Sequence, residues 1–205
     1  MDLFNQSDAN LLPFGGEVYY HDNVVNSRES DNFYQKLMTE IEWQNDVAIM
    51  FGKRIVTKRK VAWYGDIPFD YTYSKVTRKA LPWTKELLAL KEKCSEVTGS
   101  DYNSCLLNLY HSGDEGMAWH SDDEKELAHH ASIASLSFGS TRRFGFKHKK
   151  VDQKVYVVLE PGSLLEMTGS TQENWLHRLP PTKKVKTPRV NLTFRKMNLP
   201  SSTQV

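Results

Sequence analysis

The chain has 205 residues, of which 39% are hydrophobic and 25% charged, and this composition predicts one globular domain and excludes a disordered or fibrous chain. No apolar run is long enough to span a bilayer, and the opening MDLFNQSDANLLPFGG lacks the basic and apolar regions of a secretory signal. We therefore expect an intracellular protein, cytoplasmic if bacterial and nuclear if eukaryotic, which is a monomer and does not bind membranes.

Two segments in the N-terminal half have apolar residues at helical spacing, residues 27–43 and residues 82–97. Asn26, followed three residues later by Glu29, predicts a capped start for the first helix. Gly99 predicts the end of the second.

Basic residues gather in three runs, although the net charge is only +2. The runs are Lys53 to Lys60, Arg142 to Lys150 and Lys183 to Lys186. A single basic run is equally typical of a solvated edge strand. Three runs in one small domain favour a polyanionic partner.

From Ser104 onward the pattern changes to short apolar runs separated by turn residues. The runs are SCLLNLY, SIASLSFG, RRFGFKHK, KVYVVLE, SLLEMTG and RVNLTFR. Helices followed by strands, with no further helix, predict an α+β fold in which the helices pack on one side of a sandwich or jelly roll. We expect a single domain, 1–205, made of a weakly ordered lead-in (1–15), a part with helices and hairpins (16–103) and a jelly-roll core (104–197).

Three residues have the side chains of an open iron site. His120 and Asp122 share one side of an extended backbone, and His177 follows 57 residues later. Two imidazoles and one carboxylate on one face of an ion are typical of non-haem Fe(II) oxygenases. For the His-x-Asp pattern alone, the alternative interpretation is a surface histidine beside an acidic turn.

Cys94 and Cys105 lack metal-ligand spacing and are expected to be buried reduced thiols. Four other histidines are discounted as ligands because none has a carboxylate two residues away on a strand that leads into a turn: His111, His129, His130 and His148.

The run RVNLTFR alternates strictly, so Val190, Leu192 and Phe194 lie on one face of a strand and the polar residues on the other. If the polar face points inward, Arg189 and Arg195 need an anion. An open Fe(II) site needs a reductant, and 2-oxoglutarate is a dianion with a carboxylate at each end for each arginine. Asn108 and Tyr110 share one face of an earlier strand and would supply further hydrogen-bond donors. The alternative is that this face is simply exposed to solvent.

These residues resemble the AlkB family of Fe(II)- and 2-oxoglutarate-dependent dioxygenases and, within it, the animal branch that repairs duplex DNA. The likeness rests on NLYHSGDEGMAWHSDDE, NWLHRLP and PRVNLTFRK, and it extends from about Phe51 to Lys196. It implies that His120, Asp122 and His177 bind iron. It also implies a set of residues that hold 2-oxoglutarate: Asn108, Tyr110, Arg189, Asn191 and Arg195.

The resemblance further implies a double-stranded β-helix fold and a DNA-repair reaction. Fe(II), 2-oxoglutarate and O2 would remove the methyl group from 1-methyladenine or 3-methylcytosine, releasing formaldehyde and succinate. The substrate would be alkylated DNA, as duplex or single strand. Two alternatives stay open, namely the same chemistry on RNA, and a non-catalytic jelly roll that only binds nucleic acid.

Both methylated bases are cationic, so a base pocket needs aromatic faces and nearby acid. The candidate substrate-binding residues are Phe51, Arg59, Trp63, Tyr71, Tyr73, Asp123 and Glu124. Phe51, at the expected tip of a hairpin beside the first basic run, would fill the space that the flipped base leaves. Tyr71 and Tyr73 are expected in a loop, whereas Trp63 fits core packing equally well.

Two positions depart from the family's pattern. Ser121 stands where similar proteins carry a basic residue, and His129-His130 replaces a turn of the Pro/Gly type. The contacts with DNA near these positions are therefore open.

Overall fold

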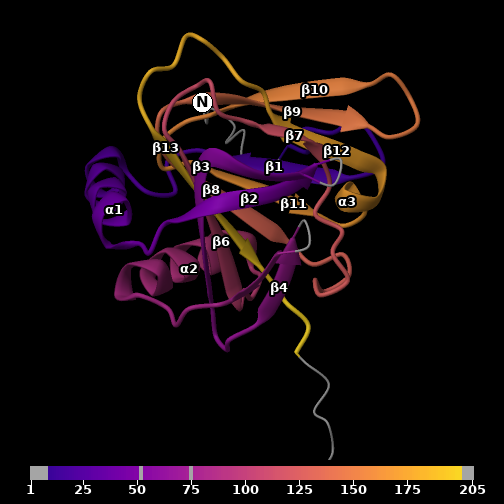
Figure 1. The fold of residues 1–205 in the computed structure, drawn as a ribbon. Coiled ribbons are helices and arrows are strands. Elements are labelled where there is room, and N and C mark those ends of the chain that lie inside the picture. The colour runs from indigo at the N-terminus through magenta and orange to yellow at the C-terminus, as the bar shows by residue number, and fades with distance from the viewer. Residues whose placement is uncertain (1–8, 51–52, 74–75, 200–205) are drawn as a thin grey trace, which may run out of the picture.

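The computed structural model describes residues 9–50, 53–73 and 76–199 and contains two large antiparallel sheets (Figure 1). The larger sheet has seven strands, in the spatial order β1 (Glu17–His21), β11 (Leu164–Thr168), β8 (Ile133–Gly139), β13 (Arg189–Arg195), β6 (Ser104–Tyr110), β3 (Lys53–Gly65) and β2 (Gln44–Met50). The second sheet has the order β10 (Lys154–Leu159), β9 (Arg142–His148), β12 (Trp175–Leu179) and β7 (Met117–His120). This arrangement confirms the predicted jelly roll.

Two 14-residue helices, α1 (Ser27–Glu40) and α2 (Lys85–Thr98), occupy the segments predicted to be helical. The amide N–H of Glu29 donates to Oδ1 of Asn26, so α1 has the predicted cap. α2 ends as predicted at Gly99, whose φ of 65° is left-handed. Within the described residues, no helix is both long and apolar enough to cross a bilayer.

The central strand β13 is buried on both faces, and the two faces differ in character. The apolar face contributes to the main hydrophobic core, where it meets residues of both helices, and α1 packs directly against β13 and β8. This face consists of Val190, Leu192 and Phe194. The polar face lines a cavity that also receives side chains from the four-stranded sheet. The polar face consists of Arg189, Asn191, Thr193 and Arg195. The alternation therefore indicates two buried environments.

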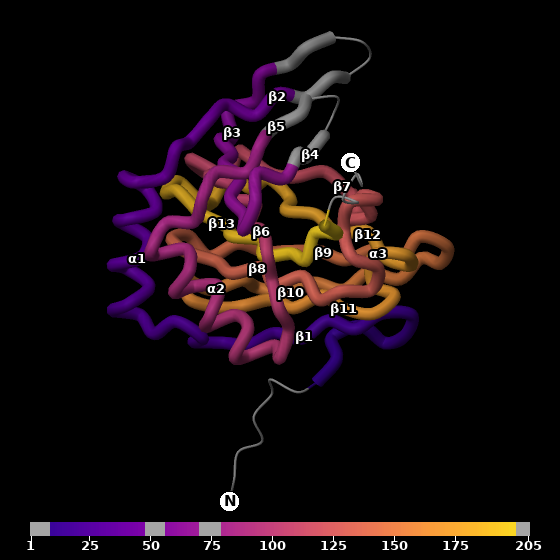
Figure 2. The backbone as a smooth tube through the Cα atoms, turned by 90° about the horizontal axis from the view of Figure 1, so that it is seen from below, coloured from indigo at the N-terminus to yellow at the C-terminus, as the bar shows by residue number. Residues whose placement is uncertain are grey.

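Two hairpins lie at the end of the molecule opposite β1 (Figure 2). β3 pairs with β6 only from Lys60 to Gly65, so the first half of β3 extends past the sheet together with β2. β4 (Asp70–Tyr73) pairs with β5 (Val76–Lys79). The loop predicted for Tyr71 and Tyr73 is therefore wrong, since both residues lie on β4.

The N-terminal lead-in also differs from its prediction. Leu12 is buried, and the indole N–H of Trp175 donates to the carbonyl of Phe14 over 3.1 Å. Residues 9–15 are therefore fastened to the core, and the prediction of a weakly ordered segment is wrong for them. Residues 1–8 lie outside the described part of the chain.

Two helix predictions need correction. A helical turn, α3 (Thr171–Asn174), interrupts the strand run that was predicted to contain no further helix. α2 begins at Lys85 and not at Pro82, because the hydroxyl of Thr84 caps it by accepting the N–H of Leu87 over 3.2 Å.

Candidate metal centre and cosubstrate pocket

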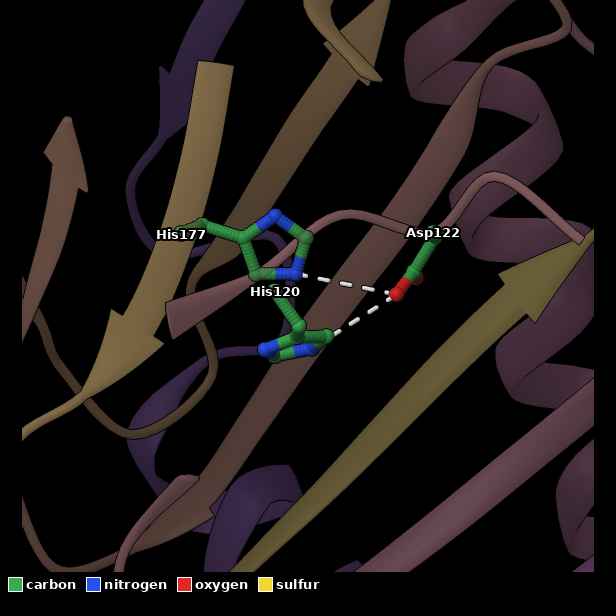
Figure 3. A group of neighbouring side chains, drawn as sticks. All are labelled: His120, Asp122 and His177. Carbon is green, nitrogen blue, oxygen red and sulfur yellow. Dashed lines mark ion pairs between the residues drawn. The ribbon is translucent and has the colours of Figure 1, made fainter. Parts of the chain in front are cut away.

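Pairing between β7 and β12 brings the two predicted histidine ligands together. His177 lies directly opposite His120 in the register, and their ring centroids are 4.2 Å apart. Asp122 follows the end of β7, and its Oδ1 is 3.6 Å from Nε2 of His120 and 3.7 Å from Nε2 of His177 (Figure 3). One donor atom from each residue therefore faces a common point.

The protonation states of this group suit a divalent metal ion. Burial disfavours the charged form of Asp122, but Arg195 and the two histidines outweigh it and hold the pKa of the carboxyl at about 2. Burial lowers the pKa of His177 to about 3, so its imidazole is neutral at neutral pH. Nδ1–H of His120 donates to the carbonyl of Ala118 over 2.8 Å, which leaves the lone pair on Nε2. Two imidazoles and one carboxylate fit Fe(II).

Asp122 is held in position from two sides. Its backbone N–H donates to Oε1 of Gln172 on α3 over 2.9 Å. Its Oδ2 accepts a hydrogen bond from the guanidinium of Arg195. These contacts direct the remaining oxygen of the carboxylate towards the histidines, as outer partners do in metal sites.

The three metal ligands, His120, Asp122 and His177, line one common cavity. Its wall contains every residue predicted to hold 2-oxoglutarate, namely Asn108, Tyr110, Arg189, Asn191 and Arg195. β13 lies between β6 and β8 in the register, which places Asn191 opposite Asn108 and Arg189 opposite Tyr110. Residues that are about 80 positions apart in the chain therefore share one cavity.

Arg189 is a buried cation, and no carboxylate of the described residues forms an ion pair with it. It is 2% exposed, and its guanidinium donates to the hydroxyl of Ser137 over 2.9 Å and lies over the ring of Tyr110. Its Nε has no hydrogen-bond partner among the described residues. Burial lowers the pKa of Arg189 to about 10, so the group stays charged at neutral pH. A carboxylate in the cavity would satisfy it.

The other predicted cosubstrate residues differ in whether their side chains already form hydrogen bonds within the protein. The amide N–H2 of Asn191 donates to Ser135 and to the carbonyl of Leu136, so this side chain is already fixed to β8. Oδ1 of Asn108 is buried and has no hydrogen-bond partner in the described part of the chain. Arg195 is engaged with Asp122. The assignment of these residues to 2-oxoglutarate stays a prediction.

The candidate substrate residues are divided between the cavity and other places. Glu124 lines the cavity, whereas the exposed Asp123 lines a neighbouring pocket that shares Asp122 and Glu124 with it. Arg59 is 8% exposed, lines the same cavity and pairs with Asp46, so it is turned inward and not towards an outer polyanion. Trp63 is absent from the described lining and packs in an apolar cluster, which supports the core alternative.

Of the three remaining aromatic candidates, two lie on a described strand and one lies outside the described residues. Tyr71 is opposite Arg78 and Tyr73 is opposite Val76 in the hairpin of β4 and β5. Phe51 lies outside the described residues, so its predicted role as a wedge stays a prediction.

The other histidines and the cysteines lie away from the iron ligands. Among the described residues, His111 meets one carboxylate, that of Glu115, whereas His129 and His130 meet Glu173 in a second group of potential metal ligands. From the sequence, His129 and His130 were discounted because neither has a carboxylate two residues away on a strand that leads into a turn, whereas Glu173 lies more than 40 residues further along the chain. The two cysteines are free and buried, as predicted: Cys94 and Cys105.

Sequence reasoning missed several residues that shape the cavity. Ser135 and Ser137 alternate with apolar residues on β8 and fix the polar face of β13, and that alternation was a usable signal. Gln172 and Asp46 carried no such signal, because each acts on a partner from another strand or loop.

Comparison with known proteins gives one family and several relatives. The family described as the 2OG-Fe(II) oxygenase superfamily matches residues 17–195. The DNA oxidative demethylase ALKBH2 of Homo sapiens is 42% identical over 182 residues, which are 83% of this chain and 70% of that protein. The alpha-ketoglutarate-dependent dioxygenase alkB homolog 3 of Bos taurus is 39% identical over 181 residues, 83% of this chain but only 63% of that protein. This chain therefore spans less than two thirds of the bovine relative. The solved structure of OsALKBH1 shares the fold, with a TM-score of 0.65 at 15% identity over 90% of this chain and 99% of that one.

Proposed function

This chain belongs to the AlkB family of 2OG-Fe(II) oxygenases, and we propose that it is an oxidative demethylase of alkylated bases in DNA. The observation that supports this most directly is the buried Arg189, which has no counter-ion among the described residues and lies in the same cavity as His120, Asp122 and His177. A metal triad alone would serve many reactions. A triad that shares its cavity with a buried cation fits an anionic cosubstrate.

In the proposed reaction His120, Asp122 and His177 would hold Fe(II), and Arg189 would pair with one carboxylate of 2-oxoglutarate. The metal and cosubstrate supply the oxidation by O2 of the N-linked methyl group, which leaves as formaldehyde, with succinate and CO2 as the other products. The chain supplies position and charge. Arg195 and Gln172 keep Asp122 ionised and oriented, and the neutral His177 binds without first losing a proton.

The acidic segment after Asp122 suits a cationic base. Glu124 lies in the cavity wall and the exposed Asp123 lines the neighbouring pocket, and both would attract a positively charged 1-methyladenine or 3-methylcytosine. Methylation at these positions blocks base pairing, so such a base leaves the duplex at lower cost than an intact one. We propose that the protein acts inside the cell as a monomer on duplex and single-stranded DNA.

The test is formaldehyde release from matched oligonucleotides that carry one methylated base. With Fe(II), 2-oxoglutarate and O2, methylated DNA should yield formaldehyde and succinate in equal amounts, and the His120→Ala variant should yield neither above background. The same methylated sequence as RNA separates the alternative substrate, since faster turnover on RNA would overturn the DNA assignment. Tight binding of the DNA without any formaldehyde would identify a non-catalytic binder.

A further inference from the structure

A second group of ligand side chains lies on the surface, between α3 and the segment that joins Asp122 to β8. It consists of His129, His130 and Glu173, whose donor atoms all lie within 4.8 Å of one another. Nε2 of His129 is 3.1 Å and Nε2 of His130 is 2.8 Å from the same carboxylate oxygen of Glu173. The two imidazole rings stack with centroids 3.8 Å apart.

Consecutive residues of an extended chain point to opposite sides, so two adjacent histidines need a special backbone to converge. His130 has a φ of 58°, a left-handed conformation that is unfavourable for a residue other than glycine. Hydrogen bonds hold this turn from both sides: Ala128 N–H donates to the carbonyl of Lys196 over 2.8 Å, and Ala131 N–H donates to that of Ala128 over 3.2 Å. The fold therefore maintains a conformation that directs both rings to one point.

Glu173 is fixed equally well, because α3 is attached to its neighbours. The backbone N–H of Lys149 donates to the carbonyl of Asn174, and its ammonium donates to that of Gln172, both over 2.8 Å. The hydroxyl of Thr171 donates to the carbonyl of Thr168 over 2.6 Å. The three donors thus come from two anchored segments, which lowers the entropy lost when they bind one ion.

We propose that His129, His130 and Glu173 bind a Zn²⁺ ion. Two imidazole nitrogens and one carboxylate oxygen are the ligand types that Zn²⁺ takes, with a water molecule in the fourth position of a tetrahedron. Ca²⁺ and Mg²⁺ prefer sites made of oxygen alone. The side chains of His129 and His130 are 78% and 45% exposed, so an ion reaches them directly from solvent.

The bound ion would fasten the segment 123–131 to α3. That segment carries Glu124 in the cavity wall and Asp123 in the neighbouring pocket, and α3 carries Gln172, which holds the backbone of Asp122. The zinc site is therefore a structural clamp on the wall next to the iron ligands. It does not depend on the proposed function, because its binding needs neither DNA nor 2-oxoglutarate.

The test is the zinc content of metal-free protein after dialysis against micromolar Zn²⁺, measured by atomic absorption. The iron ligands also accept Zn²⁺, so the unmodified protein should bind two ions per chain. The double variant His129→Gln/His130→Asn should bind one, since asparagine tolerates the left-handed backbone and keeps the turn. The variant His120→Ala should also bind one, at the surface site.

Two further variants make the result decisive. Glu173→Gln should lose the same ion as the double variant, because it removes the anionic ligand and keeps the size of the side chain. His111→Gln is the matched control, since the exposed His111 lies 3.1 Å from one described carboxylate, that of Glu115, and the variant should leave two ions bound. An unchanged zinc content in the His129→Gln/His130→Asn protein, or an equal loss in His111→Gln, overturns the proposal. Formaldehyde release from methylated DNA by the iron-loaded enzyme tests the proposed function separately.

Discussion

Arg189 is a positive charge enclosed by protein on a strand whose neighbours offer it hydroxyls and an aromatic ring. Its partners are Ser137 and the face of Tyr110, and no described carboxylate forms an ion pair with it. Enclosing an uncompensated charge costs several kcal/mol. An anion that binds in the cavity would pair with the guanidinium of Arg189 and offset this cost.

Replacement of Arg189 by glutamine should weaken the binding of 2-oxoglutarate much more than the binding of iron. Loss of a charge-assisted pair of about 2 kcal/mol corresponds to a rise of about 30-fold in the apparent KM for 2-oxoglutarate. Arg143→Gln is the control, because Arg143 is exposed and stacks on Tyr156 at 3.7 Å. Equal KM values for Arg189→Gln and the unmodified protein would remove Arg189 from the cosubstrate site.

His177 makes the stability of the metal-free protein depend on pH. Burial lowers its folded-state pKa from 6.5 to about 3. Its contribution to the free energy of unfolding is therefore present above pH 6.5 and is lost as the pH falls towards 3. Between pH 6.5 and pH 5 the free energy of unfolding should drop by about 1.5 kcal/mol from this group alone. Asp122, whose pKa is lowered to about 2, makes the free energy of unfolding depend on pH only in more acidic solution.

The measurement is urea unfolding of the protein in EDTA at both pH values, with His177→Gln beside it. The variant should lose less stability than the unmodified protein over this interval, because it has no group that titrates at that position. A drop of the same size in both proteins would contradict the assignment.

At the level of elements, the two histidines meet because β7 and β12 are adjacent in the second sheet. The sequence predicted the bounds of β6 and β13 correctly to the residue, and β13 alternates strictly over its seven positions. It did not predict β7 or β12, which are short and have no clear alternation. The pairing of His120 with His177 follows from strand order, and strand order depends on long-range packing that a local pattern does not encode.

The short helix α3 was also missed, although it positions a metal ligand. We expect Gln172→Ala to weaken Fe(II) binding about 10-fold, because the N–H of Asp122 loses its acceptor and the carboxylate becomes less fixed. Gln172→Glu keeps an oxygen at this position and should recover most of the affinity. Anaerobic Fe(II) titration measures both variants, and an affinity for Gln172→Ala equal to that of the unmodified protein would show that α3 has no part in positioning Asp122.

On the scale of the whole molecule, the two sheets and the helices give β13 two different buried surroundings. The sequence predicted the α+β class and the strand run, because apolar periodicity is a local property. It did not predict the contacts between residues that are distant in the chain. Leu12 and Trp175 fasten residues 9–15 to the core from opposite ends of the chain, and Arg59 turns inward to meet Asp46.

The central claim is that one cavity seats Fe(II) and 2-oxoglutarate together, with Asp122 and His177 on the metal and Arg189 on the cosubstrate. Visible absorption of the anaerobic protein tests it directly, because a charge-transfer band requires the keto acid to be bound to the iron. We predict a band only when Fe(II) and 2-oxoglutarate are both added, its loss in His177→Ala, and a higher 2-oxoglutarate requirement in Arg189→Gln. Absence of the band from the unmodified protein, or its persistence in His177→Ala, would contradict the account.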